Sequence, residues 1–305
     1  SGSEGLVAAG NIFMGMTESP VLIKNYLPTM NRSEIFLVMV SGMGTIAGSV
    51  MGTYIGMLGG TDPAAKVLFA THLLSASVMA VPGSIVLAKM LCPQTEEATD
   101  HVAISGKEKE NSNILDAISS GTVTGVKLMT NIAAMLLVFI SLVALANYIT
   151  EGVIGRYTGL NDWIVKITDG KAQGLTFQFI LGVITSPFMW LIGVPSQDIM
   201  LVGSLLGQKT ILNEFVAYFQ LQQWKDAGLF MYEKSILMST YILCGFANIS
   251  SIGILLGGLG VLAPEKRGLI SRIGVPAMIG GALVSVLSAT IIGICLLYTS
   301  DAADD

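Results

Sequence analysis

Long stretches of this chain contain no acidic or basic residue, and they limit the possible folds more than any motif does. Each stretch approaches or exceeds the roughly 20 residues that a helix needs to cross the hydrocarbon core of a bilayer. Only 12% of the 305 residues are charged, about half of the roughly 25% usual in soluble domains. The sequence therefore predicts an all-α, polytopic membrane protein. The charge-free stretches are 35–58, 67–88, 128–150, 172–197, 235–264 and 273–300.

Several function classes find no support in the remaining residues. The net charge of -5 gives no indication of nucleic-acid binding. Cys92, Cys244 and Cys295 lack metal or redox spacing and are interpreted as packing residues. His72 and His101 stand apart from any metal-hydrolase pattern, so we expect neither an enzyme nor a cofactor. Because His72 stands alone inside its apolar stretch, we interpret it as a hydrogen-bonded contact between helices rather than as a proton relay.

A polar segment, residues 11–20, separates the apolar residues 6–9 from the mostly apolar residues 21–27. Pro20 lacks a backbone donor and biases Ser19 away from helical geometry. We therefore expect a short helix, a break at Glu18-Ser19-Pro20 and a second short helix, with Glu18 buried. Broken backbone survives in a membrane only where protein or a water-filled cavity satisfies its polar groups. The segment is a candidate solute site.

Two of the apolar spans carry small and polar residues at their centres. The first holds Gly42, Gly44, Thr45 and Gly48, and two interpretations remain open for it. Small residues allow helices to pack closely, or the helix unwinds and presents carbonyl groups and the Thr45 hydroxyl to a cation. The second span holds Gly245-Phe-Ala-Asn-Ile-Ser-Ser251, where the polar side chains are either interhelical contacts or an unwound site.

These features occur in the same order twice, which predicts two structural repeats. In the second repeat, residues 198–216 form a short segment with Glu214 near its end, and a polar connector covers 222–234. We place the first repeat at 1–91, a polar loop and interfacial helix at 92–127, a long span and loop at 128–171, and the second repeat at 172–297. Residues 298–305 resemble a non-native tail, and we expect that amino-terminal spans precede this sequence.

Acids placed before broken spans point to a type of solute. Glu18 and Glu214 are either loop acids on a solvated surface or ligands of such a site. Carboxylates accept hydrogen bonds from hydroxyl groups, while Asn248, Ser250 and Ser251 can donate or accept. This set suits an uncharged solute that is rich in hydroxyl groups.

Three separated motifs resemble the concentrative nucleoside transporter family. They are Asn11-Ile-Phe-Met-Gly-Met-Thr-Glu-Ser-Pro20, Asn213-Glu-Phe-Val-Ala-Tyr218 and Cys244-Gly-Phe-Ala-Asn-Ile-Ser-Ser-Ile-Gly253. The resemblance runs from the first residues to about Leu297 and covers the carboxyl-terminal transport core of the family. It implies an inverted-repeat fold with re-entrant hairpins and broken helices.

The resemblance also implies roles for individual residues. Those expected at the nucleobase are Met16, Thr17, Glu18 and Val50. Those expected at the ribose are Glu214, Phe246, Asn248 and Ser251. Those expected at a sodium ion are Asn11 and Thr45 by their side chains, and Met14 and Ile46 by their backbone carbonyls.

The expected activity is cation-coupled nucleoside symport by alternating access. Sodium is the expected coupling ion, and a proton is the alternative because some bacterial relatives use protons. A passive channel is the remaining alternative activity. Many family members carry glutamine where this chain has Met16, and the Gly15-Met16 pair resembles purine-preferring members. The resemblance further implies a homotrimer in the plasma membrane, with a bacterial inner membrane as the expected location.

Overall fold

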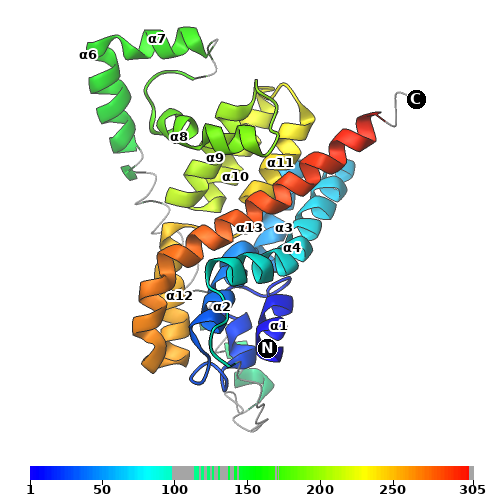
Figure 1. Ribbon diagram of the computed structural model, residues 1–305. Helices are drawn as coiled ribbons and strands as arrows, with labels where there is room; N and C mark the ends of the chain where they lie inside the picture. The colour runs from blue at the N-terminus through cyan, green and yellow to red at the C-terminus, as the bar shows by residue number, and fades with distance from the viewer. Residues whose placement is uncertain are drawn as a thin grey trace. The chain divides into compact units, whose positions relative to one another are not determined.

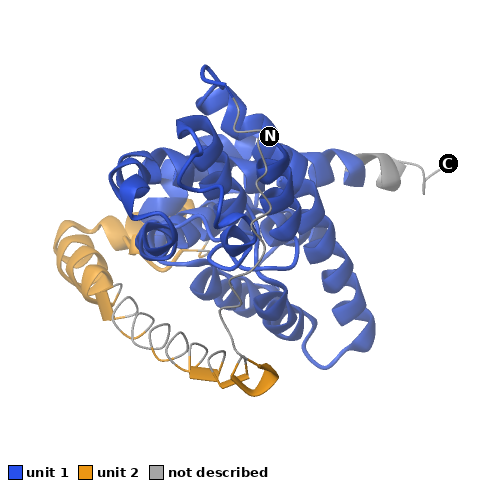
Figure 2. Cartoon of the chain, turned by 90° about the horizontal axis from the view of Figure 1, so that it is seen from below, with its two compact units in different colours: residues 1–101, 178–305 blue, residues 102–177 orange. Residues whose placement is uncertain are grey.

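The computed structural model describes residues 1–97, 144–168, 170 and 172–301, with scattered residues between 113 and 142 and with side chains up to residue 296. The chain forms two compact units, residues 1–101 with 178–305 and residues 102–177 (Figure 2). The described residues form helices and turns without a strand. The predicted all-α class is confirmed.

The first part of unit 1 is a hairpin, a helix broken in two, and a long helix (Figure 1). The break at Thr45–Ala47 separates α2 from α3, which decides between the two interpretations of this glycine-rich span in favour of unwinding. Asn31 caps the start of α2: its side chain accepts from the Glu34 N–H at 3.0 Å, and the Glu34 carboxylate accepts from the Asn31 N–H. The elements are α1 (Gly2–Gly10), η1 (Ser19–Ile23), α2 (Arg32–Gly44), α3 (Gly48–Gly59) and α4 (Pro63–Leu91).

The second part of unit 1 follows the same order after one extra helix, α8 (Phe177–Leu191). Cys244–Asn248 interrupts the apolar stretch 235–264, so this stretch contains two short helices rather than one span. The elements are α9 (Ile199–Ile211), α10 (Glu214–Asp226), α11 (Glu233–Leu243), α12 (Ile249–Leu262), η3 (Pro264–Lys266) and α13 (Arg267–Asp301).

Three helical stretches of the described residues are long and apolar enough to cross a membrane. They are Arg32–Gly59, which contains the break between α2 and α3, Pro63–Leu91 and Pro264–Leu296. The helices α8, α9 and α12 are apolar but shorter. Breaks therefore shorten several of the stretches that composition alone presents as spans.

The core of unit 1 consists of two clusters of buried apolar side chains. One is built mainly from α2, α12 and α13, and the other mainly from α3, α4, α9, α10 and α11. The half-buried ring of Phe246 packs against both clusters. Helix α13 runs past α2, α4, α11 and α12 and holds the two halves of the unit together (Figure 1). As expected for His72, its Nδ1 lies 3.1 Å from the Tyr241 hydroxyl of α11.

Unit 2 contains η2 (Tyr148–Gly155), a π-helical segment, followed by α6 (Arg156–Thr158) and α7 (Leu160–Ile167). Asn161 ties the unit together: its Nδ2 donates to the Glu151 carbonyl and its Oδ1 accepts from the Leu175 N–H, both at 3.0 Å. Residues 98–112, within the predicted polar loop, lie outside the described residues, as do His101, most of the predicted span 128–150 and residues 302–305 of the predicted tail.

Two local predictions are wrong. The first hairpin breaks earlier than expected, because α1 ends at Gly10, and its second arm is a short 3-10 helix at Ser19–Ile23 rather than an α-helix. Pro20 at the start of that arm suits this tighter turn, since its backbone nitrogen has no hydrogen to donate. The expected connector 222–234 begins later, because α10 continues to Asp226.

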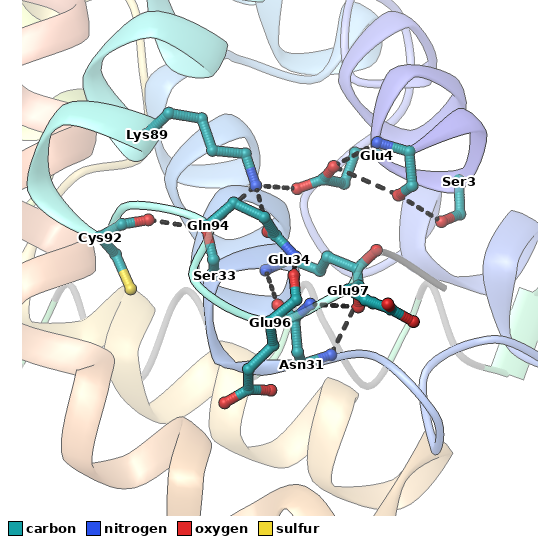
Figure 3. Close-up of polar contacts among 11 residues, drawn as sticks. Ser3, Glu4, Asn31, Ser33, Glu34, Lys89, Cys92, Gln94, Glu96 and Glu97 are labelled. Atoms are coloured by element: carbon teal, nitrogen blue, oxygen red, sulfur yellow. Dashed lines mark hydrogen bonds and ion pairs between the residues drawn. The ribbon is translucent and has the colours of Figure 1, made fainter. Parts of the chain in front are cut away.

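A lysine ties α1 to the beginning of α2 and the end of α4 (Figure 3). The Lys89 ammonium donates to the Glu4 carboxylate at 2.5 Å, to the Ser33 hydroxyl at 3.0 Å and to the Gln94 side chain at 3.0 Å. Ser33 donates in turn to the Cys92 carbonyl at 2.6 Å. This group of polar contacts holds the base of the first hairpin against the two helices that follow it.

We expect Lys89→Met to lower the free energy of unfolding by about 1–3 kcal/mol, because it removes the lysine donor from the buried Glu4 carboxylate and the donor from Ser33 and Gln94. The measurement is the melting temperature of the purified protein in detergent, which should fall by several degrees. Lys225→Met is the control, because its partner Asp226 is 56% exposed and such pairs contribute little. Equal shifts in the two variants would contradict the role of Lys89.

Candidate functional site

The two helix breaks of unit 1 meet backbone to backbone. The Phe246 N–H donates to the Thr45 carbonyl at 3.2 Å. Gly245 makes this approach possible: its φ is +140°, and a β-carbon there would lie 2.9 Å from the Met43 carbonyl oxygen and 3.0 Å from that of Gly44. Only glycine adopts this conformation without strain and lets another backbone come so near. The crossing brings polar groups from both halves of the unit to one place.

Glu214 lies beside this crossing and is 7% exposed. Its Oε1 accepts from the Tyr54 hydroxyl at 3.2 Å, and its Oε2 accepts from the Asn248 Nδ2 at 3.0 Å. Tyr54 comes from α3, Glu214 begins α10, and Asn248 caps α12, so three elements supply one cluster. Stacking of Tyr54 on Tyr218, with ring centroids 4.1 Å apart, fixes the donor.

Asn248 has a second role at the start of α12. Its Oδ1 accepts from the Ser251 N–H at 2.9 Å, from the Ser251 hydroxyl at 3.1 Å and from the Ser250 hydroxyl at 2.6 Å. An asparagine in this position satisfies a backbone donor at the helix start. The same bonds orient its amide nitrogen toward Glu214. The structure thus brings together Glu214, Asn248 and Ser251, and places Phe246 at the adjoining break.

Asn11 joins the first hairpin to the first broken helix. It is fully buried at the end of α1; its Nδ2 donates to the Ser41 hydroxyl at 3.0 Å, and its Oδ1 accepts from the Ser19 hydroxyl at 2.6 Å. The Thr45 hydroxyl donates to the Ser41 carbonyl at 3.0 Å. Asn11 and Thr45 therefore both contact Ser41: Asn11 binds the Ser41 hydroxyl, and Thr45 binds the Ser41 backbone carbonyl.

The backbone of the hairpin tip also reaches the first break. The Phe13 carbonyl accepts from the Gly48 N–H at 3.0 Å, at the start of α3. Among residues 1–97, no hydrogen-bond donor reaches the carbonyl oxygens of Met14 or Ile46. The four oxygen groups expected at a sodium ion thus belong to two segments, the hairpin tip with Asn11 and Met14 and the first break with Thr45 and Ile46, which the Phe13–Gly48 hydrogen bond joins.

The residues expected at a nucleobase are spread more widely. Met16 is buried against Gly42 of α2, and Thr17 packs on Gly258 of α12. Val50 is half-buried and belongs to the other apolar cluster. The expectation that Glu18 is buried is wrong: it is exposed, and its carboxylate accepts from the Gly15 N–H within its own turn.

Three residues of this region were not identified from the sequence. Tyr54 follows Val50 by four residues on the same face of α3, and this spacing could have indicated it. Ser41 and Lys209 carried no comparable signal. Lys209 is fully buried, and a buried lysine in an apolar helix becomes conspicuous only when its partners are known.

Comparisons with known proteins agree with the fold and the motifs. A family model described as Na+ dependent nucleoside transporter C-terminus matches residues 72–293. An uncharacterized transporter of Haemophilus influenzae is 39% identical over 297 residues, which cover 96% of this chain and 66% of that protein. Sodium/nucleoside cotransporter 1 of Rattus norvegicus is 39% identical over 308 residues, covering 96% of this chain and 44% of that protein.

A solved structure has the same fold. CNTnw in an inward-facing substrate-bound state aligns with a TM-score of 0.82 and 37% identity, over 96% of this chain and 64% of that one. A doubly substituted CNTnw in an outward-facing state aligns with a TM-score of 0.83. The chain thus spans about two thirds of the length of the bacterial relative and of CNTnw, and less than half of the mammalian relative.

We expect Gly245→Ala to lower the free energy of unfolding by about 2 kcal/mol or more. The added β-carbon strains the positive φ and meets two carbonyl oxygens of the other break. Gly253→Ala in α12 is the matched control, because a β-carbon there meets nothing within 4 Å, so alanine should leave stability unchanged or raise it by about 0.5–1 kcal/mol. Thermal unfolding of both variants measures the difference, and a tolerated Gly245→Ala would contradict the close crossing.

Proposed function

The chain belongs to the family of sodium-dependent, concentrative nucleoside transporters, and from this we propose that it forms the transport core of a cation-coupled nucleoside symporter. One observation carries the proposal beyond family membership: Glu214, Tyr54 and Asn248 form a buried, hydrogen-bonded cluster beside the crossing of two broken helices. Solute sites of transporters lie where such broken helices meet.

We propose that the ribose binds at Glu214, Asn248 and Ser251, with Phe246 lining the site. Each carboxylate oxygen of Glu214 accepts one hydrogen bond within the protein and has lone pairs left for a hydroxyl donor. A hydrogen bond to a buried carboxylate contributes about 1.5–3 kcal/mol, roughly twice a neutral one. A deoxygenated sugar leaves these acceptors unpaired and is therefore disfavoured.

We propose sodium as the coupling ion, held by Asn11, Thr45 and the carbonyls of Met14 and Ile46. Oxygen donors suit a hard cation, and among residues 1–97 no donor occupies the Met14 and Ile46 carbonyls, which supports this assignment. Bound there, the ion would draw the hairpin tip toward the first break. The bound ion would then strengthen nucleoside binding by the same factor by which the nucleoside strengthens ion binding, since the coupling free energy is reciprocal. The loaded core then exposes the site on the other side of the membrane.

The base half of the site is proposed to favour purines. Met16 offers a soft, apolar side chain where many relatives have glutamine, and Thr17, Glu18 and Val50 complete the set. An apolar wall discriminates less sharply than paired hydrogen bonds do, so we expect a preference rather than exclusion. The homotrimer and the bacterial inner membrane are likewise proposals, which family membership supports.

The test is uptake of radiolabelled adenosine into proteoliposomes that contain the full-length protein. We expect accumulation above equilibrium with an inward sodium gradient and none with a proton gradient alone. Inosine should compete more strongly than uridine. Accumulation driven only by protons would keep nucleoside transport and reject the sodium site. Equilibration without accumulation would indicate a passive channel. Equal competition by uridine and inosine would reject the purine preference.

We expect Glu214→Gln to weaken nucleoside binding about tenfold, because a neutral acceptor replaces a charged one. Binding of a 2',3'-dideoxynucleoside should change much less, since it lacks the hydroxyl groups in question. Competition binding in detergent measures both affinities. Glu233→Gln, at an exposed glutamate at the start of α11, is the control. Equal losses for the two ligands would exclude a ribose contact at Glu214.

A further inference from the structure

Lys209 is a fully buried lysine that the proposed nucleoside and sodium sites do not use. It lies in the last turn of α9, the first arm of the second hairpin. Its ammonium donates to the Ile242 carbonyl at 2.8 Å and to the Ser285 hydroxyl at 2.9 Å. Lysine is almost never fully buried without paired groups, so these partners define a built cation position.

The partners of Lys209 belong to the end of α11. Ile242 is in the last turn of that helix, and Ser285 donates to the Cys244 carbonyl at 2.8 Å. The carbonyl end of a helix carries partial negative charge, and α11 ends here because the chain breaks at Cys244. Lys209 thus places one positive charge against the Ile242 carbonyl and, through the Ser285 hydroxyl, close to the Cys244 carbonyl at the second break.

The first repeat has an equivalent arrangement without a lysine. Asn11 follows the last residue of α1, the first arm of the first hairpin, and contacts Ser41 in the last turn of α2, just before the first break. Lys209 is at the end of the first arm of the second hairpin and contacts Ile242 just before the second break. Both side chains therefore lie near the end of the first arm of their hairpin, and both reach the last turn of the helix that precedes a break.

We propose that Lys209 is a tethered cation that takes, in the second repeat, the place that a free cation takes in the first. The transporter then has one exchangeable cation site and one permanent positive charge, and it couples one cation to each nucleoside. The number of ions rests on the proposed function, whereas the assignment of Lys209 as the resident cation of the second break rests on its own contacts.

Two substitutions of Lys209 distinguish a cation site from a purely structural contact. Lys209→Asn removes the charge, frees space and supplies the same amide oxygen that Asn11 offers in the first repeat. The Ile242 carbonyl and the Ser285 hydroxyl would remain as further oxygen ligands for sodium. Lys209→Met keeps most of the volume but supplies neither charge nor ligand.

The experiment measures the melting temperature of the purified full-length protein against sodium chloride concentration, with choline chloride holding ionic strength constant. A second site that binds only the folded state adds a second linkage term. We expect the slope of melting temperature against the logarithm of sodium concentration to roughly double in Lys209→Asn. Lys209→Met should melt lower than the unsubstituted protein and keep its slope.

An unchanged slope in Lys209→Asn would overturn the proposal. If that variant does not fold at any sodium concentration, the charge that enters per nucleoside in the unsubstituted protein decides instead: one supports the proposal and two overturns it. The outcome also separates this inference from the sodium proposal. The melting temperature of Lys209→Asn could rise with sodium while that of the unsubstituted protein does not. That result would reject the first-repeat sodium site and keep Lys209 as the resident cation.

Discussion

The hydrogen bond from the Phe246 N–H to the Thr45 carbonyl is the contact on which the rest of unit 1 depends. Interrupting a helix frees backbone donors and acceptors that lipid cannot satisfy. This chain interrupts two apolar helices and lets each break satisfy part of the other. The crossing requires close backbone approach, and Gly245 supplies it. Each hairpin in turn contacts a broken helix, the first through the Phe13–Gly48 hydrogen bond and the second through Glu214 and Asn248.

Asparagine side chains at helix ends connect local structure to the site. Asn11 ends α1, Asn213 begins α10, and Asn248 begins α12. Asn213 and Asn248 each accept from a backbone N–H of the helix that they begin, at 2.9 Å. Asn248 keeps its amide nitrogen for Glu214, and Asn11 spans two serines of different elements. Residues at the first or last position of a helix thereby also supply polar groups of the site.

Charge is distributed unevenly between the two breaks. The first break has neutral oxygen donors from side chains and carbonyls. The second has a buried ammonium beside α11 and a buried carboxylate at the start of α10. Because helix ends facing a break carry partial charge, each needs a counter-charge or a donor. The two halves of the unit meet this need with different groups. The two repeats therefore share one order of elements but differ in the chemistry of their breaks.

Composition alone determined that the chain is all-helical and crosses a membrane, because a charge-free stretch of about 20 residues has few other stable environments. The two breaks were predicted only as one of two interpretations, since glycine and polar residues inside an apolar stretch allow either close helix packing or local unwinding. The family motifs further grouped Glu214, Asn248 and Ser251, which the structure brings together.

The tertiary structure decided which polar residues are buried and what they contact. Glu18 and Glu214 both border apolar stretches, yet Glu18 is exposed and folds back on its own turn, while Glu214 meets Tyr54 and Asn248. Tyr54 and Lys209 acquire their roles from elements distant in the chain. Periodicity and composition report each segment by itself, whereas burial and pairing arise only when segments 30 to 160 residues apart are packed together.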